Sequence, residues 1–171
     1  MIIIRDANIE QDAHPICKML QALAYEESVR SFVRPEALIE QTLRGTPRLK
    51  VAVAEAKEHG AHKVVGVAIA YRGFDVLSAT PGLHLSDIYV RPEYRKGGLA
   101  RRLIAHIVQM NPNDPCEWMS WTMLSENKVA RGFYQHMGAT HLDVDFMAFG
   151  ASDLTALIRN TEQHQQTYAE E

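Results

Sequence analysis

The residues around a glycine pair, Gly97-Gly98, constrain the fold more than any other part of the chain. A strand pattern over residues 83–90 precedes the pair, and a helical stripe of apolar residues follows it: Leu99, Leu103, Ile104, Ile107 and Val108. A helix that begins after such a turn has first amides without intrahelical partners, at the positive end of its dipole. Glycines also permit backbone angles closed to other residues and place no side chain between the backbone and a ligand. The segment therefore predicts a strand–turn–helix unit suited to a pyrophosphate.

Two basic residues, Arg95 and Lys96, stand just before the glycines and add positive charge to this turn. The alternative is that the glycines only make a tight turn and that these cations, with Arg91, Arg101 and Arg102, are solvated surface. The spacing excludes a Walker A phosphate loop and a Rossmann dinucleotide motif, because neither glycine pattern is present. The turn is therefore predicted to be a phosphate-binding turn of a type other than the Walker A loop and the Rossmann motif.

The remaining patterns predict a mixed α/β domain. Strands are expected at residues 2–4, 49–54, 64–71, 83–90, 116–122 and 141–148, with the second and third joined as an antiparallel hairpin. Helices are expected at residues 12–25, 36–44 (after Pro35), 99–108, 126–137 and 151–160. Asp12 is the expected N-cap of the first helix, with Pro15 in its first turn, and Gly45 and Gly138 are expected to end two others. This order predicts one domain over residues 1–160 and a polar, frayed tail at residues 161–171.

The composition indicates a globular protein of the cell interior. The 171 residues are 46% hydrophobic, and the formal net charge of −3 gives no support for a nucleic-acid partner. No apolar run approaches the ~20 residues that span a bilayer, so no membrane partner is expected and a soluble, cytoplasmic protein is predicted. Cys17 and Cys116 are expected to be free thiols. His59 and His62 share one turn without a suitable third ligand, so no metal site is expected.

The motif Arg95-x-x-Gly98-x-Ala100 resembles the R/Q-x-x-G-x-G/A signature of the GNAT family of acetyl-coenzyme A-dependent acyltransferases. Residues 87–95 also resemble the strand and loop that precede this signature. The resemblance implies a GNAT-like α/β fold, in which helices flank a central, splayed, mixed and mostly antiparallel sheet. It also implies that the loop amides hold the coenzyme pyrophosphate while the strand backbone pairs with the pantetheine arm. The coenzyme-binding residues implied for this segment are Ile88, Tyr89, Val90, Arg95, Lys96, Gly97, Gly98, Leu99, Ala100 and Arg101.

A second resemblance to the same family lies downstream, in the pattern N-x-x-A-x-x-F-Y that begins at Asn127 and is followed by Met-Gly-Ala at residues 137–139. By resemblance, Asn127 and Ala130 belong to the coenzyme site and Tyr134 lies near the thioester sulfur. Tyr134 is therefore the candidate acid for the departing thiolate. The alternative is that Phe133 and Tyr134 are only core aromatics.

The likeness is greatest to the polyamine (spermidine/spermine-like) acetyltransferase branch, through residues 23–27, the strand at 85–90 and Glu117-Trp118. That branch often has a glutamate where this chain has Ser86, so the identity of the base stays open. Glu26, Glu27 and Ser86 are the candidate acceptor-binding residues. A homodimer is implied by the resemblance alone.

The chemistry requires a base, because an alkyl amine with a pKa near ~10.4 cannot attack a thioester until it loses a proton. Asp87 is the leading candidate, and the others are Glu26, Glu27 and His84. Strand alternation predicts one face with Leu85, Asp87 and Tyr89, and an opposite face with His84, Ser86 and Ile88. The structural alternatives are an acceptor for a neighbouring group at Asp87, a packing residue at His84 and a solvated helix end at Glu26 and Glu27.

The sequence thus predicts acetyl transfer from acetyl-coenzyme A to a primary amine of a small molecule, with a polyamine-like amine favoured. Direct attack in a ternary complex needs no protein nucleophile. The alternative acceptors are an amino acid, an aminoglycoside or a protein amine. An alternative of another class is a non-catalytic acyl-coenzyme A-binding sensor module.

Overall fold

The computed structural model describes residues 1–28, 34–44, 49–58, 60–111, 113 and 115–169. It divides into two compact units, Met1–Phe133 and Tyr134–Glu171, which are described separately below. The single domain expected over residues 1–160 therefore stays a prediction, and Gly45, the expected end of the second helix, lies outside the described residues.

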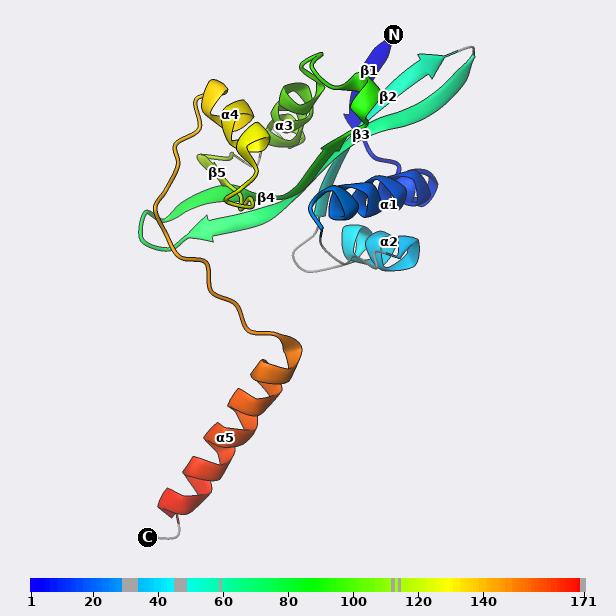
Figure 1. Cartoon of the computed structure of the whole chain (residues 1–171). Helices are drawn as coiled ribbons and strands as arrows, with labels where there is room; N and C mark the ends of the chain where they lie inside the picture. The colour runs from blue at the N-terminus through cyan, green and yellow to red at the C-terminus, as the bar shows by residue number, and fades with distance from the viewer. Residues whose placement is uncertain (29–33, 45–48, 59, 112, 114, 170–171) are drawn as a thin grey trace. The chain divides into compact units, whose positions relative to one another are not determined.

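The first unit is built on a five-stranded sheet in the order β1-β2-β3-β4-β5 (Figure 1). Its first four strands pair antiparallel, and the last pair is parallel. The strands are β1 (Ile2–Asp6), β2 (Leu49–Glu58), β3 (Ala61–Asp75), β4 (Thr80–Val90) and β5 (Trp118–Ser120). The predicted mixed, mostly antiparallel sheet and the predicted hairpin between the second and third strands are confirmed.

Helices cover both faces of this sheet, as Figure 1 shows. On one face lie α1 (Ile9–Glu26) and α2 (Pro35–Leu43), and on the other lies α3 (Leu99–Gln109). A 3₁₀ turn, η1 (Pro92–Tyr94), separates β4 from α3, and α4 (Lys128–His136) follows β5. The second unit contains the end of α4 and the long helix α5 (Ala151–Ala169). No helix of the described residues has the length and apolar character needed to cross a bilayer.

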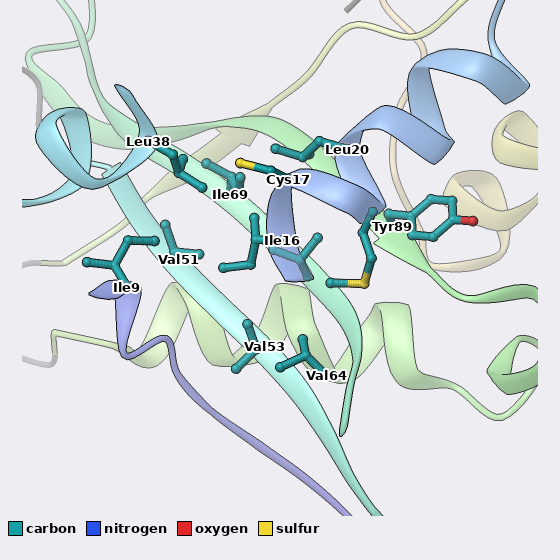
Figure 2. Packing of buried hydrophobic residues seen from close by; sticks show 12 residues of the cluster. Ile9, Ile16, Cys17, Leu20, Leu38, Val51, Val53, Val64, Ile69 and Tyr89 are labelled. Carbon is teal, nitrogen blue, oxygen red and sulfur yellow. The ribbon is translucent and has the colours of Figure 1, made fainter. Parts of the chain in front are cut away.

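One part of the core of the first unit lies between the sheet and α1 (Figure 2), and a second part lies under α3, where Leu103 and Ile107 are fully buried. Ile16 of α1 is fully buried, and it belongs to a cluster with Val53 of β2, Val67 of β3 and Tyr89 of β4. Alternate residues of a strand point to one face, and Val51 and Val53 of β2 and Val67 and Ile69 of β3 join this cluster in that way. Burial of these side chains, at roughly 1.5–3 kcal/mol each, is the main force that holds α1 against β4.

The start of α1 differs from the prediction that Asp12 is its N-cap. The N-cap is Asn8, whose side-chain oxygen accepts a hydrogen bond from the amide of Gln11 at 3.4 Å. Asp12 lies within the first turn of the helix, is only 5% exposed and forms two hydrogen bonds with the Arg5 guanidinium, at 2.7 and 3.1 Å. Pro15 consequently lies inside the helix rather than in its first turn. Asn8 and Asp12 are both residue types that suit an N-cap. The ion pair of Asp12 with Arg5 of β1 determines that Asn8 takes this position.

Three predictions about the end of the chain are wrong. The fifth strand covers Trp118–Ser120 rather than residues 116–122, because it pairs with only three residues of β4. The described residues contain no strand at 141–148, and the apolar side chains of that segment, such as Val144 and Phe146, are exposed. A pattern of period two forms a strand only where a partner backbone is available. The last helix, α5, also continues to Ala169, past residue 160 where it was predicted to end.

Candidate active site

The outer edge of β4 offers unpaired backbone groups over its second half. Strand β5 pairs with β4 only at residues 82–84, which leaves the β5 side of β4 without a strand neighbour beyond that point in the described structure. The amide of Arg91 donates to the carbonyl of Val65 in β3, at 2.9 Å. Because successive residues of a strand direct their N–H and C=O groups to opposite edges, those of Val90 and Ile88 face away from β3. The Val90 carbonyl accepts from the Arg95 guanidinium at 2.7 Å, so the groups of this edge that the described residues leave for a ligand are the Val90 amide and both groups of Ile88. An extended ligand can therefore pair with the backbone of β4 here.

The turn that follows β4 uses left-handed backbone angles at two positions. Gly98 has a φ of +74°, and Lys96, not Gly97, supplies the other with a φ of +65°. The prediction that both glycines provide special backbone angles is thus half right. A Cβ at Gly98 would meet no atom within 4 Å, so this position borders open space.

The N-terminus of α3 is formed around Gly98, which is the N-cap and has no side chain to accept from the first amides. The first intrahelical bond runs from the amide of Arg102 to the Gly98 carbonyl, at 3.1 Å. The amides of Leu99, Ala100 and Arg101 precede that bond and point out of the helix end. Leu99 is buried and anchors the helix, while Arg101 is exposed. This end of α3 can hold an anion without a competing carboxylate or hydroxyl cap.

Arg95 connects the turn to the end of α1. Its guanidinium donates to both carboxylate oxygens of Glu26, at 2.8 and 3.0 Å, and to the Val90 carbonyl, at 2.7 Å. It also lies over the ring of Tyr89, 5.2 Å from the centroid, while the Tyr89 hydroxyl donates to Glu26 at 3.1 Å. Glu26 therefore neutralises part of the charge of Arg95 and holds the turn in place, a contact that sequence reasoning did not find.

A β-bulge interrupts β4 at Ser86. Asp87 pairs with Ile69 of β3, and the next residue of β3, Ala70, pairs with Leu85, so Ser86 is the extra residue. The Ser86 hydroxyl donates to the carboxylate of Asp87, at 2.5 Å.

The bulge changes which side chains share a face of β4. Directly paired residues point to the same face, so Asp87 lies on the α1 face with Ile69, and Leu85 lies on the opposite face. His84 pairs with Tyr71, two residues beyond Ile69, and so shares the face of Asp87. The prediction that Leu85 accompanies Asp87 while His84 lies opposite is therefore wrong, because an extra residue reverses the alternation.

Two carboxylic acids come together beside this strand. Glu27 directly follows α1 and is half-buried, as is Asp87. Burial raises the pKa of Glu27 above its usual value, and the negative charges of Asp87 and Glu26 raise this pKa further. Glu27 and Asp87 are thus near enough for the charge of one to act on the other, whereas Glu26 is engaged by Arg95. A carboxyl with a raised pKa is better matched to proton transfer near neutral pH.

The residues of the second motif lie in and around α4. The side-chain oxygen of Asn127 accepts from the amide of Ala130 at 3.0 Å and so caps the start of this helix. Gly138 ends the helix as predicted, with a φ of +92° and with the amide of Ala139 bonded to the Tyr134 carbonyl at 3.1 Å. Tyr134 is half-buried and is the first residue of the second unit, so its role as the acid stays a prediction.

The comparisons with known proteins agree with this arrangement. The profile of the Acetyltransferase (GNAT) family matches residues 14–139. Two curated relatives, both named thialysine N-epsilon-acetyltransferase, are from Bos taurus and Mus musculus. The bovine protein is 29% identical, over 82% of this chain and 85% of its own length, and the murine one is 30% identical, over 81% and 84%. A solved aminoglycoside N-acetyltransferase in complex with CoA superposes with a TM-score of 0.71 at 21% identity, covering 88% of this chain and 95% of that one.

The chain belongs to the GNAT acetyltransferase family, because the family profile covers most of its length. The observed fold agrees with this assignment, since solved acetyltransferases share it. The resemblance found in the two sequence motifs is thereby confirmed at the level of family and fold.

Replacing Gly98 by Ala (G98A) should weaken coenzyme A binding about tenfold, because alanine strains a left-handed φ at a cost of roughly 1–2 kcal/mol and adds a methyl group at the helix end. The matched control is Gly97→Ala, since Gly97 has no positive φ and a Cβ there would approach only the Tyr94 carbonyl, at 3.9 Å. Calorimetric titration with coenzyme A measures both. Equal affinities for the two variants would show that the backbone conformation at Gly98 does not matter for the site.

Proposed function

We propose that this protein transfers the acetyl group of acetyl-coenzyme A to a primary amine of a small molecule, with a polyamine-like amine favoured. The observation that carries the proposal is the strand β4 itself. Its outer edge, which no described strand pairs beyond residue 84, leads into the Arg95–Gly98 turn, and its α1 face presents Asp87, whose charge acts on Glu27. A thioester bound along that edge would supply an activated acetyl group. The acids on the adjacent face would receive the proton that the amine must lose.

Each group has a defined part in this scheme. The first amides of α3, the backbone groups of Ile88 and the Val90 amide hold and orient the coenzyme, and the amides of β4 polarise the thioester carbonyl. Glu27, directly or through a water, accepts the proton from the ammonium group, and Asp87 attracts the cationic acceptor. Tyr134 donates a proton to the departing thiolate. The amine attacks directly, which needs no protein nucleophile.

The names of the relatives support an amine acceptor, since thialysine and aminoglycosides both carry amines. The test is acetyl-coenzyme A-dependent thiol release with spermidine, linear diamines, amino acids, an aminoglycoside and a lysine peptide. Release with one class would identify the acceptor. Coenzyme A binding without release for any amine would contradict the proposal and favour the non-catalytic sensor.

Replacing Glu27 by Gln (E27Q) should lower kcat/KM about a hundredfold, a usual contribution of a general base. In the unmodified protein, activity should fall on acidification at a pH above the ordinary glutamate pKa of 4.5, since the pKa of Glu27 is raised. Asp87→Asn removes a nearby negative charge and should therefore shift this fall to lower pH. The pH profile of kcat/KM checks both expectations. The control is Glu10→Gln at the exposed start of the same helix.

A homodimer in the cytoplasm is part of the proposal. Large apolar side chains of the second unit are exposed, among them Phe146 and Phe149, and such side chains support contact with a second copy. The free thiols of Cys17 and Cys116 support a reducing compartment. A monomer mass in sedimentation at micromolar concentration would contradict the dimer, and recovery in the membrane fraction would contradict the location.

A further inference from the structure

The indole of Trp118 lies flat on a pair of glycines in the β3–β4 hairpin. Gly73 and Gly82 are directly paired, and Trp118 of β5 pairs with Gly82 on its other side. A Cβ added at Gly82 would lie 2.1 Å from two indole ring atoms, and one at Gly73 would lie 2.6 Å from a third. The indole N–H donates to the Thr80 carbonyl, at 3.2 Å. The two missing side chains thus create the space that the indole fills, and the hydrogen bond fixes its orientation.

A second pair of rings continues this surface. Tyr71 and His84 lie two residues from Gly73 and Gly82 and therefore share their face of the sheet. Their ring centroids are 5.0 Å apart, and the imidazole Nδ1 of His84 lies 3.2 Å from the Ser120 hydroxyl. We call Tyr71, His84 and Trp118 the aromatic floor. All three side chains are half-buried, so part of each is accessible.

The aromatic floor ends at the pair of acids already described. Asp87 shares its face of β4, and the negative charge of Asp87 acts on Glu27. At ~3.4 Å per residue, and with one residue lost to the bulge, the position covered by Trp118 lies roughly 14 Å from Asp87 along the strand. Among the described residues, this face of the sheet thus has carboxylates at one end, Asp87 with Glu27 near it, and the indole of Trp118 at the other.

We propose that the aromatic floor binds the part of the acceptor remote from the reacting nitrogen and selects acceptors that carry a second ammonium group at that distance. The proposal rests on the proposed function, because it needs the reacting amine at Glu27 and Asp87. A linear diamine fits both ends: one nitrogen lies at the carboxylates, the methylene chain covers Tyr71 and His84, and the second ammonium lies over the indole. The face of tryptophan is the aromatic surface that binds cations best.

The experiment compares linear diamines with the monoamines of equal chain length, from propane to dodecane, as acceptors. The unmodified protein should prefer octane- to dodecanediamine over the matching monoamines, with kcat/KM about tenfold higher. Trp118→Leu should remove this preference while activity with propylamine stays the same. Gly82→Ala retains the indole but displaces it, and should have the same effect as Trp118→Leu.

The control is Phe74→Leu, since Phe74 is an exposed aromatic residue of the same hairpin on the opposite face. A diamine preference that persists in Trp118→Leu, or its absence from the unmodified protein, would overturn the aromatic floor while leaving acetyl transfer intact. If no amine is acetylated, the proposed function fails. Calorimetric titration with dodecanediamine then tests the aromatic floor by itself. Binding to the unmodified protein that Trp118→Leu abolishes would support the floor, and absence of binding to the unmodified protein would overturn it. Circular dichroism verifies that each variant is folded.

Discussion

Turnover of the Tyr134→Phe variant (Y134F) should fall about a hundredfold or more, while its affinity for coenzyme A stays within about twofold. The phenol is the proposed acid for the thiolate that leaves when the amine attacks. Phenylalanine keeps the ring and its packing but has no proton to donate. An acid that acts only in the transition state lowers kcat and kcat/KM together when it is removed. Steady-state kinetics and calorimetric titration with coenzyme A measure the two effects.

The control for this substitution is Tyr25→Phe, which makes the same chemical change at a side chain that is 86% exposed. It should leave both turnover and coenzyme affinity unchanged. Equal turnover in Y134F and Y25F would remove Tyr134 from the mechanism. A parallel loss of coenzyme affinity in Y134F would instead make Tyr134 a binding residue.

The second large effect concerns stability and lies away from the active site. Asp12→Ala (D12A) should lower the free energy of unfolding by about 3 kcal/mol, because it leaves a partly buried guanidinium without one of its two carboxylates. Arg5 donates to Asp12 and also to Glu55 of β2, at 2.6 and 2.9 Å, so this cluster joins β1, α1 and β2. The Asp12 carboxylate also accepts from the Asn8 amide, at 2.9 Å, at the start of the helix.

Thermal unfolding should report this loss as a fall in Tm of about 10 °C, given roughly 2–4 °C per kcal/mol for a chain of this size. The control is Glu10→Ala, which removes an exposed carboxylate from the same turn of α1 and should change stability by less than ~0.5 kcal/mol. A loss in D12A no greater than that in E10A would show that Glu55 alone satisfies Arg5.

The active site shows how far reasoning from the residues extends. The glycine turn, the amphipathic helix after it and the strand before it follow from local patterns, and all three lie where predicted. The family assignment also follows from two short motifs and is confirmed. Patterns of this kind are reliable because each depends on residues within one or two turns of one another.

The arrangement of side chains on β4 could not be predicted in this way. The bulge at Ser86 reverses the alternation, so that His84 joins Asp87 and Leu85 leaves that face. Similarly, Arg95 resembles a phosphate ligand in sequence, yet its partner is Glu26, 69 residues earlier. A bulge and an ion pair depend on which backbone lies alongside, and that choice is made by packing between distant segments.

The sequence by itself determined the order of helices and strands through Ser120, the glycine turn between β4 and α3 and the family of the protein. The tertiary structure alone decided that Asp12 pairs with Arg5 rather than capping α1, that Glu27 rather than Glu26 accompanies Asp87, and that Trp118 covers a pair of glycines. The physical reason is the same in each case. Hydrophobic periodicity and turn chemistry are local and are written along the chain. Hydrogen bonds, burial and charge contacts between segments exist only once the chain has folded.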